Sequence, residues 1–99
     1  MLTLQTTRVY EFGTLAVNNR IQAEMLRLAQ LVPREGKIAR IDPAPTHVEI
    51  ANRISTHREA VTRELNRLSR LGIIDRQGGA LLVSDVDRLA TMVHEATGE

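Results

Sequence analysis

The sequence predicts a single, mainly α-helical domain with a small β-sheet. Two helix-start signals follow closely on one another, at Thr46 and at Thr56, and each has a glutamate three residues later. They indicate a short helix, a tight turn and a longer helix rich in arginine. Two short apolar runs separated by Gly78 and Gly79 come next, and they are typical of a β-hairpin. The predicted fold is therefore a winged helix-turn-helix.

The composition fits one such domain and excludes several other classes of protein. With 99 residues, 42% of them apolar and 25% charged, the chain can bury one modest core of aliphatic side chains. It has no cysteine, which excludes disulfides and thiolate metal sites, so we expect a cytoplasmic location. No window is apolar enough to span a membrane and no signal peptide is recognisable, so no membrane partner is expected.

The first third of the chain carries apolar residues at helical spacing and predicts two helices within residues 5–32. We expect a break between them at residues 13–17, with Asn18 capping the second helix. That helix should end at Val32, because a proline follows. Residues 37–41 alternate apolar and basic side chains, which indicates a short edge strand.

The two capping boxes predict helices over about 47–53 and 57–70. The first helix must be short, since the second cap follows almost at once. Ala51 is small enough to let the two helices cross closely. The positions expected to fill the wedge between them are Ile50, Ala51, Ile54, Val61 and Leu65, and Leu68 continues the buried stripe of the longer helix.

The last third predicts the hairpin and one further helix. The apolar runs at 73–76 and 80–83 are joined by Gln77, Gly78 and Gly79. A final helix, capped by Ser84 or Asp85, should turn its apolar residues inward. These residues are Val86, Leu89, Met92 and Val93.

The side of the 57–70 helix opposite its apolar stripe is polar. Its residues are Arg58, Glu59, Thr62, Arg63, Asn66 and Arg70. Arginine can bond guanine bidentately and glutamate can accept from cytosine, so Arg58 and Glu59 in the first turn suit base reading. The free amides at the two helix starts, near Thr46 and Thr56, suit phosphate oxygens. We expect Asn66, Arg67 and Arg70 to be ordinary solvated residues.

The net charge is only +1, but residues 53–76 hold six arginines against three carboxylates, which favours a polyanionic partner.

The stretch from Pro45 to Val83, PTHVEIANRISTHREAVTRELNRLSRLGIIDRQGGALLV, resembles the DNA-binding domain of the Crp/Fnr superfamily of bacterial transcription regulators. The earlier TTRVYEFGTLAVNNRIQAEMLRLA resembles the linker that precedes it. The most specific element is THREAVTREL, an Arg-Glu pair followed by an arginine one turn later. The resemblance implies base contacts from Arg58, Glu59 and Arg63. It departs from the family at Ser55, a turn position where some relatives have glycine.

The resemblance also implies contacts to the phosphates or other parts of the DNA. The residues concerned are Thr46, Thr56, Thr62 and Gln77.

The same resemblance implies that this chain is the C-terminal part of a longer regulator. We expect residues 1–16 to be the end of a dimerisation helix with its linker, and residues 17–99 to be the winged helix-turn-helix domain. No cofactor is expected in this chain, and the effector of the missing N-terminal domain is unknown. The expected partner is double-stranded DNA with a pseudo-palindromic operator, bound by a homodimer of the full-length protein. A contact with RNA polymerase stays open.

Two other classes of function fit the sequence less well. An enzyme or metal protein is not expected, because His47, His57 and His94 lie far apart and no catalytic or metal-ligating spacing joins them. The alternative is a winged-helix module that binds protein or only dimerises. Such a module should show aromatic or aliphatic anchors on the polar face of the 57–70 helix, and that face has none.

Overall fold

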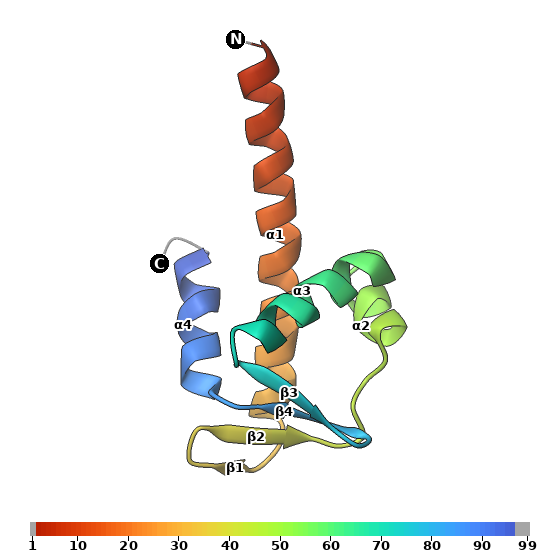
Figure 1. Ribbon diagram of the computed structural model, residues 1–99, viewed down its shortest axis with the longest axis vertical. Helices are drawn as coiled ribbons and strands as arrows, with labels where there is room; N and C mark the ends of the chain where they lie inside the picture. The colour runs from red at the N-terminus through yellow and green to blue at the C-terminus, as the bar shows by residue number, and fades with distance from the viewer. Residues whose placement is uncertain (1, 97–99) are drawn as a thin grey trace.

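A computed structural model of the chain describes residues 2–96, and the side chains of residues 13–95. Over these described residues the fold consists of four helices and a small sheet, which confirms the predicted fold class (Figure 1). In chain order the elements are α1 (Leu2–Gln30), β1 (Arg34–Glu35), β2 (Ile38–Ile41), α2 (His47–Arg53), α3 (Arg58–Arg70), β3 (Ile74–Gln77), β4 (Ala80–Val83) and α4 (Val86–Ala96).

The sheet is antiparallel throughout, with the strand order β1-β2-β4-β3. The predicted hairpin is present, but Gln77 pairs with Ala80 and belongs to β3, so the turn has two residues, not the three expected. In it Gly78 has a φ of 60° that favours glycine. We call residues 74–83 the wing. Strand β1 was not predicted, because its two residues are exposed and show no apolar alternation.

Helix α1 is continuous, so the predicted break at residues 13–17 is wrong, as is the helix start at Asn18. Gly13 is exposed and leaves all backbone donors in place. A single glycine costs a helix only about 1 kcal/mol, whereas proline would also remove a hydrogen bond. The predicted end near Val32 is nearly right, since the helix stops at Gln30.

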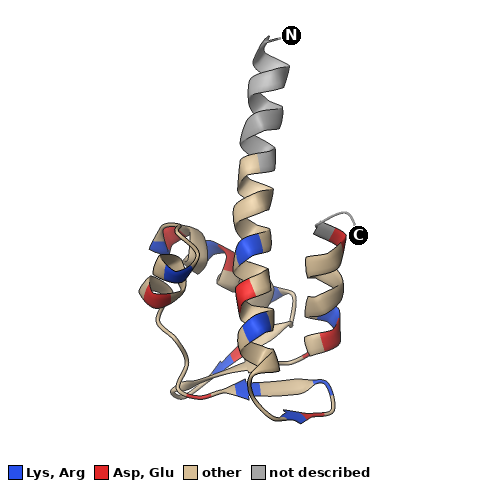
Figure 2. Cartoon of the chain, turned by 180° about the vertical axis from the view of Figure 1, so that it is seen from behind, with Lys and Arg blue, Asp and Glu red and all other residues tan. Residues whose placement is uncertain are grey.

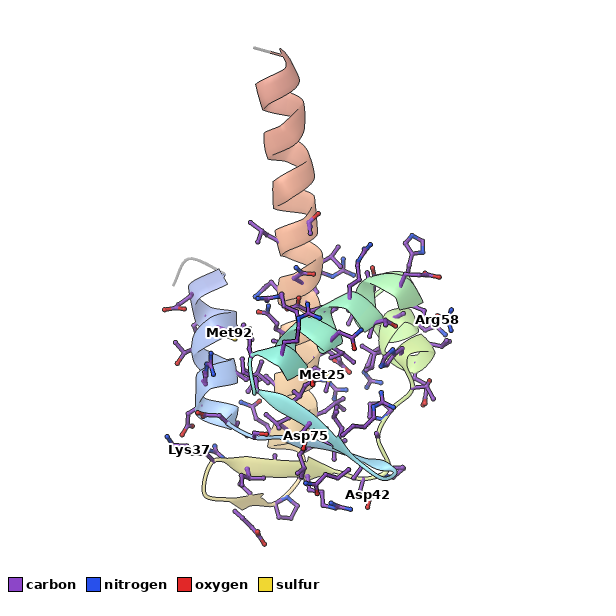
Figure 3. The ribbon with its side chains drawn as sticks, viewed as in Figure 1. Met25, Lys37, Asp42, Arg58, Asp75 and Met92 are labelled. Carbon is purple, nitrogen blue, oxygen red and sulfur yellow. The ribbon has the colours of Figure 1, made fainter. Side chains whose placement is uncertain are left out.

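The core lies where α1, α3, α4 and one face of the sheet meet. Helix α1 contributes Ile21, Met25 and Ala29, which are spaced one turn apart and fully buried, and Met25 lies near the centre of Figure 3. Helix α4 packs beside α1 and buries Val86 and Leu89. The buried apolar residues of α3 and the sheet are Val61, Leu65, Leu68, Ala39, Ile41, Ile74, Ala80, Leu81 and Val83, which confirms the predicted apolar stripe of α3.

Helices α2 and α3 form the predicted helix-turn-helix. Ile50 and Ala51 are buried between them, and Ile54 is partly buried. The first capping box is present: the Thr46 hydroxyl accepts from the Glu49 amide at 3.0 Å, and the Glu49 carboxylate accepts from the Thr46 amide at 3.0 Å. These bonds hold the pKa of Glu49 below its ordinary value, through the Thr46 backbone bond first.

The second predicted cap is wrong. Helix α3 starts at Arg58, and its N-cap is His57, which makes no side-chain capping bond. Thr56 instead closes the turn, since its amide donates to the Ala51 carbonyl at 2.9 Å. Ser55 has a φ of 57°, the left-handed conformation that explains why glycine suits this turn.

The contrast between the two threonines is testable by urea unfolding. Thr46→Ala should lower the free energy of unfolding by about 1 kcal/mol, because a helix amide loses its capping acceptor. Thr56→Ala is the matched control and should change it by less than about 0.5 kcal/mol. Equal losses from both substitutions would contradict the assignment of the α3 cap to His57.

Candidate nucleic-acid interface

The predicted base-contacting residues lie on the free side of α3. Arg58, Glu59 and Arg63 are all exposed, and Thr62 is half-buried. Val61, Leu65 and Leu68 hold the opposite side of the helix in the core. Helix α3 is thus strongly amphipathic, with an accessible polar face.

The structure divides these residues between two hollows on either flank of α3. Arg58 lines a cleft of about 420 Å³ together with the start of α2 and the wing, which we call the wing cleft. Figure 3 shows Arg58 at the outer end of the α2–α3 unit, away from α4. Arg63 lines a larger groove of about 790 Å³ between α3 and α1, which we call the α1–α3 groove. Glu59 lines neither of these two hollows.

The predicted phosphate-contacting residues are also separated. Thr46 lines the wing cleft, whereas Thr56 lines the α1–α3 groove. Gln77 is exposed at the end of β3, beside the wing turn. Contacts to DNA from all of these residues stay predictions, and the structure shows only that Thr46 and Gln77 are exposed and Thr56 half-buried.

His47, at the start of α2, contacts both α3 and the wing. Its Nδ1 lies 2.7 Å from the Thr62 hydroxyl oxygen, and its Nε2 lies 3.0 Å from Nη2 of Arg76. Arginine can only donate, so Nε2 accepts and the proton of the neutral ring lies on Nδ1, which donates to Thr62. Partial burial lowers the pKa of His47, and the nearby charges of Arg76 and Arg58 lower it further.

The sequence-based site did not include His47 or Arg76. The two residues are 29 positions apart, and neither belongs to a motif that would connect them. Only the packing of the wing against the start of α2 brings them together.

Helix α3 also carries a buried carboxylate within its apolar side. The side chain of Glu64 is 1% exposed and accepts two bonds from Arg67, at 2.8 and 2.7 Å. It accepts a third from Gln22 of α1 at 2.7 Å. Three donors satisfy the buried charge. Arg67, expected to be ordinary surface, therefore serves to neutralise Glu64, whereas Asn66 and Arg70 are exposed as expected.

A second buried carboxylate joins α1 to α2. Glu24 accepts two bonds from Arg27 of its own helix, at 2.9 and 2.8 Å, and lies 3.1 Å from Arg53 at the end of α2. The two carboxylates thus attach α1 to both helices of the helix-turn-helix. Sequence reasoning missed both, because acidic residues in amphipathic helices are usually solvated.

Basic and acidic residues are interspersed along the elements of the domain (Figure 2). The ion pair of Glu64 with Arg67 removes one charge of each sign, so it leaves the excess of arginines over carboxylates around α3 unchanged. Arg58, Arg63 and Arg70 are exposed on α3, and Arg76 is exposed on the wing. These exposed arginines carry the basic excess of the region.

Within the described residues no three potential metal ligands gather. None of the helices over residues 2–96 is long and apolar enough to cross a membrane.

A short helix crossed closely by a longer one, with one polar face exposed and a wing directly after it, defines a winged helix-turn-helix of the DNA-binding class. Residues 19–92 match the Crp-like helix-turn-helix domain, so the chain belongs to that family. The resemblance to Crp/Fnr regulators is confirmed. Domains of this family occur in transcription regulators and are typically not enzymes.

Solved structures of such regulators share the fold. Oxidised CprK in complex with o-chlorophenolacetic acid is 22% identical with a TM-score of 0.72, over 93% of this chain and 40% of its own. The reduced CO-sensing protein from R. rubrum is 27% identical with a TM-score of 0.72, over 92% of this chain and 42% of its own. CO-dependent transcription factor CooA from Carboxydothermus hydrogenoformans is 22% identical with a TM-score of 0.67, over 93% of this chain and 41% of its own.

This chain thus corresponds to about two fifths of each of these proteins, at the C-terminal end. No curated protein sequence is significantly similar to it.

The Glu64–Arg67 pair predicts a large effect of one arginine on stability. Arg67→Met leaves a buried carboxylate without its main partner and should lower the free energy of unfolding by about 3 kcal/mol. Arg70→Met removes an exposed arginine one turn further along and should change it by less than about 0.5 kcal/mol. Urea unfolding of both variants measures the difference, and similar stabilities would rule out the pairing.

The lowered pKa of His47 predicts weaker folding in mild acid. As the pH falls, His47 takes up a proton at about pH 6.5 in the unfolded chain but only at a lower pH in the folded chain, so acid first stabilises the unfolded state. The free energy of unfolding that the neutral ring contributes is therefore fully present above the unfolded-state pKa. It is lost as the pH falls toward the lower pKa of the folded state. Urea unfolding from pH 7 downward measures the loss. The slope should be smaller in His47→Gln, and an unchanged slope would contradict the assignment.

Proposed function

We propose that this chain is the sequence-specific DNA-binding domain of a bacterial Crp/Fnr-type transcription regulator, with α3 entering the major groove. The observation that carries the proposal is the exposed polar face of α3, which includes exposed arginines. The opposite side of the helix packs in the core. Arg58, Glu59 and Arg63 on this face would contact base edges.

Phosphate contacts would set the register of α3 in the groove without reading sequence. The residues proposed for this role are Thr46, Thr56, Thr62 and Gln77. Gln77 is exposed at the end of β3, from which it would contact the backbone beside the groove occupied by α3. Thr46 and Thr56 lie on different flanks of α3, so they would contact different parts of the backbone.

The full-length protein would bind a pseudo-palindrome as a homodimer, with two α3 helices in successive major grooves about 10 base pairs apart. Residues 1–16 would form the end of the dimerisation helix and its linker. An effector would bind to a part of the protein outside this chain. Among the similar proteins, one CprK structure contains o-chlorophenolacetic acid and the protein from R. rubrum senses CO. Such a regulator would act in the cytoplasm.

Binding to a protein partner is less well supported. It would need large apolar side chains on the accessible face of α3. Among the described side chains the large apolar ones with most exposure are Leu15, Leu31, Ile38, Val48 and Leu71, and none of them belongs to α3.

Selection of bound duplexes from a random pool tests the proposal. The wild-type chain should return a consensus half-site, and Arg58→Ala should lose preference at one base pair, by about 1–3 kcal/mol or roughly 5- to 150-fold. Gln77→Ala should weaken all sequences alike. Arg20→Ala removes an exposed arginine of α1 and is the control. An unchanged consensus for Arg58→Ala would contradict base reading by this residue.

A further inference from the structure

We propose that His47 is a positioning residue that holds Arg76 of the wing as a DNA-backbone contact and keeps the wing in register with α3. The inference rests on the proposed function, which it deepens by adding a residue pair that the family resemblance did not supply. It begins from the two bonds of one imidazole ring, to Thr62 on α3 and to Arg76 on β3.

The imidazole of His47 bonds to side chains from two elements other than its own helix, α3 and β3. The loop before α2 is tied to the wing turn by one backbone bond, from the Ala44 amide to the Gly79 carbonyl at 2.8 Å. His47 adds the connection from the start of α2 to both β3 and α3. Because Nε2 accepts from Arg76 and Nδ1 donates to Thr62, both bonds require the same neutral tautomer.

Holding Arg76 matters because its side chain is exposed. An unbonded arginine beside the wing turn would lose rotamer entropy on contacting a phosphate. Because Arg76 is already bonded to His47 before DNA binds, part of that entropic cost is removed. Guanidinium groups have five donors, so a bond from Nη2 to His47 leaves others for a phosphate. Arg76 is thus oriented and still able to bind an anion.

The charges around His47 also fit a phosphate. Arg58 and Arg76 both line the wing cleft, and its lining residues include no carboxylate. Two carboxylates close in sequence to the lining residues already accept hydrogen bonds: Asp75 accepts from the Arg76 amide at 2.9 Å, and Glu49 accepts from the Thr46 amide. A neutral imidazole between two arginines avoids a third cation in the free protein, and leaves the two guanidinium groups available for a polyanion.

Two substitutions of His47 separate its two bonds. His47→Gln places an amide oxygen near the position of Nε2, so it can still accept from Arg76 but loses the bond to Thr62. His47→Asn places an amide near the position of Nδ1, so it keeps the Thr62 bond and releases Arg76. Arg76→Gln removes the cation itself.

Binding of each variant to a short duplex carrying the wild-type consensus tests the role in DNA binding. His47→Asn should weaken binding about three- to tenfold, the net effect of one hydrogen bond, and His47→Gln should restore most of it. Arg76→Gln should lower the slope of log affinity against log salt concentration by about 0.9, the loss of one phosphate contact. The double variant His47→Asn, Arg76→Gln should bind no more weakly than Arg76→Gln alone.

Nitrogen NMR of the DNA-free chain tests the bond to Arg76 independently. The His47 signals, identified by their loss in His47→Gln, should show a protonated Nδ1 and an unprotonated Nε2. Arg76→Gln should raise the pKa of His47, because a neighbouring positive charge is removed. A ring protonated on Nε2, or a pKa unchanged in Arg76→Gln, would overturn the proposed bond.

The outcomes separate the two proposals. If the wild-type chain binds duplex DNA but Arg76→Gln leaves affinity and salt slope unchanged, the role of Arg76 is wrong and the proposed function stands. If His47→Asn and His47→Gln weaken binding equally, His47 does not act through Arg76. A wild-type chain that binds no duplex overturns the proposed function together with the DNA contact of Arg76, whatever the NMR result.

Discussion

The fold depends on the way α3 is held from one side only. Three aliphatic residues and the buried carboxylate of Glu64 face inward. The bond from Gln22 of α1 to Glu64 fixes the rotation of α3 about its own axis, whereas Arg67, on the same helix as Glu64, neutralises the charge. An apolar stripe alone tolerates some rolling, because hydrophobic contact is not directional. A buried carboxylate bonded to a neighbouring helix does not, since a small rotation would break the hydrogen bond from Gln22 and leave part of the charge without a donor. The polar face of α3 therefore points in one defined direction.

The two buried carboxylates have a common design. Each accepts two bonds from an arginine three residues later on the same helix, and each also joins a second element. Glu24 attaches α1 to α2 through Arg53, and Glu64 attaches α3 to α1 through Gln22. Helices α1, α2 and α3 are consequently connected by polar contacts as well as by the core, so displacement of α1 would carry the helix-turn-helix with it.

Local signals in the sequence were enough for most of the fold. Three of these signals act within a few residues. The capping box at Thr46 predicted α2, the apolar spacing predicted α3, and the glycines of the wing turn predicted the β3–β4 hairpin. The exposure of Arg58, Glu59 and Arg63 followed from the same spacing.

The features that the sequence did not predict depend on contacts between residues that are far apart in the sequence. Gln22 and Glu64 are 42 positions apart, and no local pattern marks the glutamate as buried. The division of Arg58 and Arg63 between two hollows likewise depends on where α1 and the wing pack. The continuity of α1 was missed because a glycine weakens a helix without ending it.

That continuity gives α1 the geometry of a screw. Each residue advances the axis by about 1.5 Å and turns it by about 100°. The half of α1 beyond Val17 is fixed to the domain through Ile21, Met25 and Ala29. Gain or loss of one residue before Gly13 would therefore swing the exposed side of α3 through more than a quarter of a circle relative to the start of α1. Gain or loss of seven residues would nearly restore the original orientation. Only certain lengths of α1 therefore keep the exposed side of α3 in the same orientation relative to a part of the protein attached before it.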